Sequence, residues 1–261
     1  MKNMHIEIWS DISCPWCFIG KARFNKALAT FSHAEHVKVA HRSFELDPRL
    51  AQTRPTTGAA HAEKYGMTPA QARAAEANLA GIARKEGLEY LVEFRDHGNT
   101  FDLHRLLQLA ATQGLEHELL TRFYEGNFAS ERTIYDSEHQ VELAVHAGLD
   151  EAEVRTVLAD KRAYANKVRK DEAEAAQLGI NAVPFFLIDR KYGLSGAQPI
   201  EVFSEVLGRA WTDRQSELTI VGAADQAGCD ADGACDLPGR TGVGGDRRAT
   251  GRLLTDPGFT Y

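Results

Sequence analysis

Two cysteines separated by two residues, Cys14-Pro15-Trp16-Cys17, are the residues of this chain best suited to chemistry. They follow a strand-like run at residues 5–9 and open a segment with apolar residues at helical spacing. Unpaired N–H groups and the helix dipole favour negative charge at a helix N-terminus, so the first sulfur is placed to react as a thiolate. The second sulfur, one turn further, can attack a mixed disulfide and release its partner. The spacing therefore predicts a reversible dithiol–disulfide pair.

A zinc site is the alternative interpretation of the same motif. Structural zinc takes four ligands, so a Cys-x-x-Cys pair needs a second pair of Cys or His residues. The other cysteines, Cys229 and Cys235, have five residues between them and lie in a Gly-rich stretch. Proline and tryptophan between the first two sulfurs, at a strand-to-helix junction, favour redox chemistry, and we expect no metal there. Asp11 and Ser13, just before the pair, are expected to cap the helix.

Composition and charge exclude some classes of protein. The net charge of −7 over 261 residues is opposite to the basic face of a general nucleic-acid binder. No apolar run approaches the roughly 20 residues of a membrane span. The first residues lack the apolar core and cleavage site of a secretory signal, which predicts a cytoplasmic protein. In that compartment, paired cysteines are usually catalytic, redox-sensing or metal-bound.

The order of predicted elements indicates how the cysteines are positioned. A strand at 37–46 follows the first helix, and residues 49–178 are predicted as successive helices, with capping boxes at 68–71 and 137–140. Strands return at 183–188 and 192–196, and a helix starts at Pro199. This βαβ, helical block, ββα order predicts an α/β fold with one mixed sheet. The domains expected are 1–48 with 179–212 as one unit, 49–178 as an inserted helical domain, and 213–261 as a flexible tail.

Val183-Pro184 begins the third predicted strand, where proline has no N–H for the ladder. It is either an ordinary strand-initiating proline or a cis bond facing the sulfurs. In the second arrangement the Val183 backbone pairs with an extended substrate and presents the substrate sulfur to Cys14. Trp16, between the two cysteines, is predicted to contact substrate, with simple packing as the alternative.

The tail pair, Cys229 and Cys235, has three interpretations. It is a relay that exchanges disulfides with Cys14 and Cys17, a local disulfide or free thiols without a role, or a metal ligand pair. A relay is favoured because a tethered dithiol reaches a high effective concentration.

Several other polar residues are predicted to be structural. The dispersed histidines are expected to be surface or core groups without a function: His41, His104, His117, His139 and His146. Capping and surface pairing are expected for Asp102 and Arg105. The charged run at 167–174 is predicted as a solvated helix face.

The chain resembles the thioredoxin superfamily, specifically its DsbA-like branch with a helical insertion. The CPWC motif and residues 179–186 match in kind and order. Ser10-Asp11, residues 99–105 and residues 192–198 are similar to the FrnE-like subgroup. The resemblance covers roughly residues 4–212. It implies a thioredoxin fold and thiol–disulfide oxidoreductase activity, with Cys14 as nucleophile, Cys17 as resolving thiol and Pro184 as the cis-proline.

The resemblance also sets the expected cofactors and partners. A redox-active disulfide without another cofactor is expected, with glutathione use left open. The expected partners are disulfide-containing proteins or small thiols as substrates, and a reductant or oxidant that recycles the cysteine pair. Neither nucleic acid nor a membrane is expected as a partner, and a homodimer is possible. Glutathione-dependent relatives, including 2-hydroxychromene-2-carboxylate isomerase and kappa-class glutathione transferases, share the topology. Isomerase or transferase activity is therefore the alternative function, beside a zinc-binding module.

Overall fold

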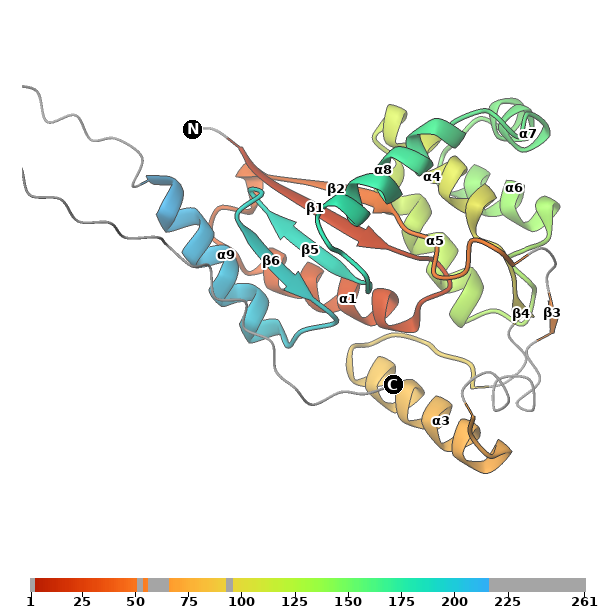
Figure 1. The fold of residues 1–261 in the computed structure, drawn as a ribbon, viewed down its shortest axis with the longest axis horizontal. Coiled ribbons are helices and arrows are strands. Elements are labelled where there is room, and N and C mark those ends of the chain that lie inside the picture. The colour runs from red at the N-terminus through yellow and green to blue at the C-terminus, as the bar shows by residue number, and fades with distance from the viewer. Residues whose placement is uncertain (1–2, 51–53, 56–65, 93–95, 216–261) are drawn as a thin grey trace, which may run out of the picture. The chain divides into compact units, whose positions relative to one another are not determined.

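The computed structural model describes residues 3–50, 54–55, 66–92 and 96–215. Its centre is a four-stranded mixed sheet in the order β2-β1-β5-β6 (Figure 1). Strand β1 pairs in parallel with β2 and antiparallel with β5, and β6 pairs antiparallel with β5. The strands are β1 (Met4–Ser10), β2 (Val37–Ser43), β5 (Phe185–Ile188) and β6 (Tyr192–Ser195). The predicted α/β fold with βαβ and ββα halves of one mixed sheet is confirmed.

Helices cover both faces of the sheet. Helices α1 (Pro15–Ala29) and α9 (Ile200–Gln215) pack on one face, and α8 (Ala165–Gln177) lies on the other (Figure 1). A hydrophobic core lies between the sheet and helices α1 and α9. It is formed by every second residue of the strands and by aromatic residues of the helices, among them Ile6, Ile8, Phe24, Phe186 and Phe203. On the α8 side Trp9 is fully buried, and its indole Nε1 donates to the carbonyl oxygen of Asp171 at 3.0 Å.

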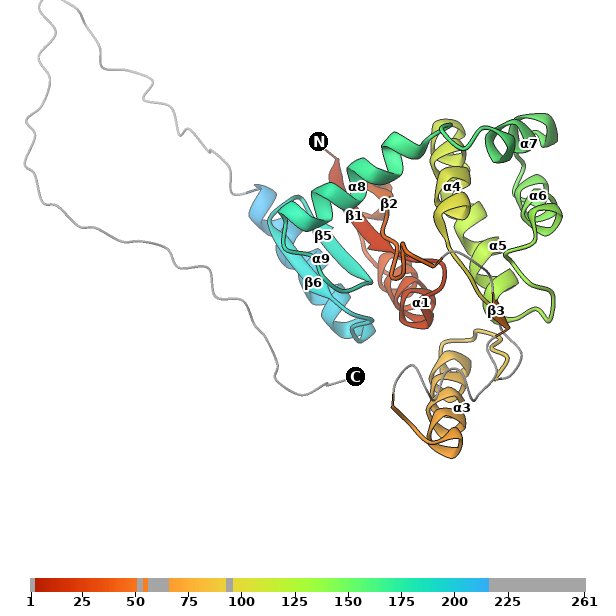
Figure 2. The ribbon, with the colours of Figure 1, turned by 45° about the vertical axis from the view of Figure 1, so that its right-hand side comes forward.

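A second group of helices lies between the two halves of the sheet in sequence. They are α3 (Pro69–Lys85), α4 (Phe101–Gln113), α5 (Glu116–Phe128), α6 (Ser137–His146) and α7 (Glu151–Ala159), here called the helical block. Helices α4 to α7 gather beyond the β2 edge of the sheet (Figure 2), and α3 contributes Ala80 and Ala83 to the same hydrophobic core. The remaining short elements are a 3-10 turn η1 (Ala34–His36) and a two-residue pair, β3 (Arg54–Pro55) with β4 (Asp96–His97).

Local signals account for several helix ends. The capping box of Thr68 and Gln71 starts α3 as predicted, and Gly114 ends α4 with the positive φ of 73° that glycine accepts without strain. The predicted cap of α6 is wrong by one residue, because the Asp136 carboxylate, rather than Ser137, accepts the His139 N–H.

Carboxylates of helices satisfy the outer edge of β2, which has no strand beside it. The His41 N–H donates to Glu116 at 3.2 Å, and the Ser43 N–H donates to Asp171 at 3.0 Å. These side chains replace a neighbouring strand and keep the edge from pairing with another chain.

The prediction of a wholly solvated face at 167–174 is wrong for Asp171, which is 4% exposed.

Within the described ranges no helix has the length and apolar character of a membrane span. Residues 216–261, including Cys229 and Cys235, lie outside the described residues.

Candidate active site

The predicted cysteines stand at the first turn of α1. Cys14 is the N-cap residue, and its carbonyl oxygen accepts the N–H groups of Cys17 and Phe18 at 3.0 and 3.3 Å. Pro15 occupies the first turn, where a missing N–H costs nothing. Cys14 therefore stands at the N-terminal end of α1, as the spacing predicted. The expectation that Asp11 or Ser13 caps this helix is wrong, since the cap has no side-chain hydrogen bond.

The two thiols are free and buried, but to different degrees and with different neighbours. Cys14 is 5% exposed and Cys17 is 1% exposed. Burial raises the pKa of Cys17 well above its ordinary value, and Cys14 beside it raises that pKa further. A hydrogen bond from the Asp11 backbone N–H to the Cys17 sulfur only partly opposes this rise. Cys17 is therefore a protonated thiol at neutral pH and must lose a proton before it can act.

The Val183–Pro184 peptide bond lies opposite the first sulfur and is cis, as the sequence analysis expected. The Cys14 thiol is 3.7 Å from the carbonyl oxygen of Val183. Glycine in α1 allows close packing behind this contact, because a Cβ on Gly20 would stand 3.0 Å from Cγ of Pro184. The structure thus brings together Cys14, Cys17, Val183 and Pro184. Trp16 is partly buried against the helical block, and its contact with substrate stays a prediction.

Asp11 is a site residue to which the sequence analysis gave the wrong role. Its side chain is 1% exposed, and its carboxylate accepts Ser13 N–H, Ser13 O–H and Leu46 N–H at 3.2, 3.0 and 2.7 Å. Burial raises the pKa of Asp11, but His104 and the Leu46 N–H outweigh burial and hold that pKa below its usual value. Asp11 is therefore a buried carboxylate that fixes the loop before the cysteines to the loop after β2.

The helical block reaches the same loop from the other side. Asn127 of α5 donates to the carbonyl oxygen of Ile12 at 3.0 Å, and Tyr124 donates to that of Asp11 at 3.5 Å. Phe18, directly after the second cysteine, stacks on the rings of Tyr124 and Phe128. Both cysteines consequently belong to the hydrophobic core of the block.

Residues 99–105 form the structural link between the block and the redox loop. Asn99 donates to Glu45 at 2.9 Å, and His104 places its Nε2 atom 3.5 Å from Oδ1 of Asp11. Arg105 pairs with Asp102 at 2.8 Å as predicted, but the prediction of a surface location is wrong, because the Arg105 side chain is fully buried. Its guanidinium donates to three backbone carbonyls, those of Val157, Asp160 and Ala163. The run of polar residues in this segment was visible in the sequence, but their partners were not.

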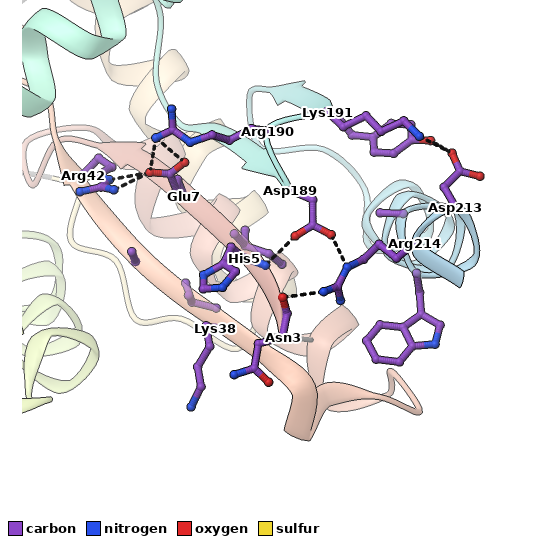
Figure 3. Close-up of a pocket in the computed structure, with 16 residues that line it drawn as sticks. Asn3, His5, Glu7, Lys38, Arg42, Asp189, Arg190, Lys191, Asp213 and Arg214 are labelled. Carbon is purple, nitrogen blue, oxygen red and sulfur yellow. Dashed lines mark hydrogen bonds and ion pairs between the residues drawn. The ribbon is translucent and has the colours of Figure 1, made fainter. Parts of the chain in front are cut away.

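A separate hollow of about 780 Å³ lies at the opposite end of β1 and contains none of the predicted site residues. Its acidic groups are already paired (Figure 3). Glu7 contacts Arg42 and Arg190, Asp189 contacts Arg214, and Asp213 contacts Lys191. Across the described part of the chain, no three His, Cys, Asp or Glu side chains come together as a metal-binding group.

Known proteins resemble this chain in sequence and in fold. A model of the DSBA-like thioredoxin domain matches residues 5–208. The crystal structure of probable DsbA oxidoreductase SCO1869 from Streptomyces coelicolor is 55% identical, with a TM-score of 0.79, and covers 91% of this chain and 100% of its own. The uncharacterized protein YwbO of Bacillus subtilis is 28% identical over 208 residues, which is 78% of this chain and 96% of YwbO. The cytosolic disulfide reductase DsbM from Pseudomonas aeruginosa, solved with GSH, shares the fold at 16% identity and a TM-score of 0.56, covering 80% of this chain and 99% of its own.

Proposed function

This chain belongs to the DSBA-like thioredoxin domain family, and from that premise we propose that it is a thiol–disulfide oxidoreductase acting through Cys14 and Cys17. The observation that carries the proposal is the position of the Cys14 sulfur, at the first turn of α1 and 3.7 Å from the Val183 carbonyl oxygen. A substrate strand paired beside Val183 and Pro184 would bring its own sulfur to the same place. Trp16 adds an aromatic wall next to that position.

The reaction proceeds in two exchanges. The Cys14 thiolate attacks one sulfur of a substrate disulfide, forms a mixed disulfide and expels the other substrate sulfur as a thiolate. Cys17 then loses its proton and attacks the Cys14 sulfur, which forms the Cys14–Cys17 disulfide and expels the second substrate thiolate. Two electrons pass from the cysteine pair to the substrate, and both departing thiolates take up protons.

Recycling requires a thiol reductant when the chain reduces its substrates, and a disulfide oxidant when it oxidises them. We propose glutathione as the small thiol of this step, a role supported by the similarity to DsbM, which was solved with GSH. The same relative, described as cytosolic, supports a cytoplasmic setting. No further cofactor is needed, since both electrons are held by the two sulfurs.

The test is an equilibrium redox titration of the full chain in glutathione buffers, with metal content measured on the same sample. We expect one two-electron transition that is lost in Cys14→Ser, and accumulation of a stable mixed disulfide in Cys17→Ser. Absence of the transition, or zinc bound at stoichiometry, would overturn the proposal and leave the sulfurs as structural or ligating groups. Glutathione-dependent turnover by the Cys14→Ser, Cys17→Ser double variant would instead support the isomerase or transferase alternative.

The tail cysteines are proposed to act as a relay for the same site. A tethered dithiol acts at an effective concentration of about millimolar. Turnover by the Cys229→Ser, Cys235→Ser variant is therefore expected to be slower while the titration of Cys14 and Cys17 is retained. Equal turnover with every reductant and substrate tested would remove the relay from the mechanism.

A further inference from the structure

The cis-proline strand is joined to the loop that follows β6. The carbonyl oxygen of Pro184 accepts the N–H of Gly196 at 2.8 Å, which ties the start of β5 to this loop. The next residue, Ala197, lies against α1, because a Cβ on Gly20 would stand 3.4 Å from its Cα atom. The position of Val183 beside the first sulfur therefore depends on where this loop is held.

Arg23 of α1 holds the loop by a direct hydrogen bond. Its Nη1 atom donates to the Ala197 carbonyl oxygen at 2.6 Å, and its Nε atom donates to Oε1 of Glu86 at 2.7 Å. One guanidinium thus joins the helix that follows Cys14, the loop beside the cis-proline and the segment after α3. The rigid fork of N–H groups in arginine suits such a bridge, because its donors point in fixed directions.

Glu86 is a firm anchor for this bridge, although it stands at the C-cap of α3, where the helix dipole disfavours a carboxylate. Lys26 donates to its second oxygen at 2.8 Å. Burial raises the pKa of Glu86, but hydrogen bonds from Lys26 and Arg23 outweigh burial and hold that pKa below its usual value. The same segment is fixed to α5, because the Leu91 N–H donates to the Phe128 carbonyl oxygen at 2.7 Å.

We propose that Arg23 is a positioning residue for the strand that pairs with substrate, with Glu86 as its anchor. It fixes the backbone of Val183 and Pro184 relative to the Cys14 sulfur. The inference rests on the proposed function, since it concerns the first of its two exchanges. Its effect is specific to substrates that pair as an extended strand, because a small disulfide has no strand to place beside the cis-proline.

The experiment compares two substrates with the same leaving group. A short linear peptide with one cysteine, and free cysteine, are each converted to the mixed disulfide with nitrothiobenzoate. In the reduced full-length chain with Cys229→Ser and Cys235→Ser, the Cys14 thiolate attacks the substrate sulfur and forms a disulfide with it. Nitrothiobenzoate leaves as a coloured thiolate with the electron pair of the broken bond, so colour release measures the first exchange.

We expect this parent to react faster with the peptide than with the cysteine derivative, because only the peptide pairs with the cis-proline strand. In Arg23→Gln the peptide reaction should slow by about 10- to 100-fold, the size expected for a displacement of about 1 Å. The reaction of the cysteine derivative should stay within about threefold of the parent, because it needs no strand pairing.

Lys26→Gln is the matched control. Across the described ranges the Lys26 ammonium donates to Glu86 alone, and its side chain is 43% exposed. Its loss should change both rates by less than about twofold, since an exposed ion pair contributes little. If Arg23→Gln does not fold, Glu86→Ala removes the anchor instead and should slow the peptide reaction in the same selective way.

The possible results are distinguishable. A parent that releases no nitrothiobenzoate from either substrate would refute the proposed function. Equal rates of the parent with both substrates, or a peptide rate unchanged in Arg23→Gln, would contradict only the positioning role. Equal slowing of both substrates in Arg23→Gln, or the same selective loss in Lys26→Gln, would also contradict it and reduce Arg23 to a structural residue.

Discussion

Glu116 gives the sharpest stability prediction, because its carboxylate joins the helical block to the open edge of β2. Burial, with a smaller contribution from the charge of Asp171, raises the pKa of Glu116 from an ordinary value of 4.5 to about 7, although the His41 N–H and Arg42 oppose the rise. The folded chain therefore binds a proton here that the unfolded chain does not hold between these two values. The contribution of Glu116 to the unfolding free energy is therefore largest at low pH, and it falls as the pH rises toward 7.

The size of the effect follows from the two values. Each tenfold difference in proton affinity is worth about 1.36 kcal/mol. Between about pH 5 and about pH 8, the wild-type chain should lose roughly 2.5 kcal/mol of unfolding free energy through Glu116 alone. Glu116→Gln has the same shape and keeps an oxygen for the His41 N–H, but it cannot titrate. The unfolding free energy of the variant minus that of the wild type should thus rise by about that amount between about pH 5 and about pH 8.

Urea unfolding of both proteins at several pH values measures this difference directly. All other titrating groups are shared, so they cancel when the two curves are subtracted. A difference that stays constant with pH, within about 0.5 kcal/mol, would refute the reasoning that Glu116 is protonated in the folded chain at neutral pH. A difference that grows in the opposite direction would mean that the His41 contact outweighs burial.

Two further stability predictions use paired variants in the same urea assay. Arg105→Met should cost about 3–5 kcal/mol, because it leaves buried carbonyl oxygens without a donor. Lys161→Ala, which removes the ion pair of a mostly exposed lysine, should cost less than about 1 kcal/mol, and equal costs would contradict the buried role of Arg105. Gly20→Ala should destabilise by about 1 kcal/mol because its Cβ meets Pro184, while Gly208→Ala in α9, with nothing within 4 Å, should stabilise by about 0.5–1 kcal/mol. A gain of stability in both glycine variants would show that α1 has room beside Pro184.

Much of the fold was predictable because its signals are local. A proline at the first turn, the Thr68 capping box and glycine at helix ends each depend on residues within one turn of each other. The alternation of β1 places Ile6 and Ile8 on one face and Glu7 and Trp9 on the other, which needs no knowledge of distant parts. The error at α6 arose where two good caps, Asp136 and Ser137, are adjacent and local preference does not separate them.

The supporting residues of the site were missed for the opposite reason. Asp11 and His104 are far apart in sequence, and neither carries a pattern that names the other. A histidine in an amphipathic helix is as consistent with packing as with chemistry, and an aspartate before a helix suggests a cap. Asp171 illustrates the same limit, because charge periodicity along α8 does not indicate which carboxylate meets the edge of β2.

The helical block has a direct bearing on the chemistry of the cysteines. Hydrogen bonds from Asn127 and Tyr124 hold the carbonyls of the loop before Cys14, while His104 contacts Asp11 within that loop. The sheet contributes the opposite wall through Val183. The block therefore holds the loop that leads to both cysteines, and the cis-proline strand faces the Cys14 sulfur. Substitutions in the block that loosen this loop should accordingly alter the reactivity of the cysteine pair, although no residue of the block is a cysteine.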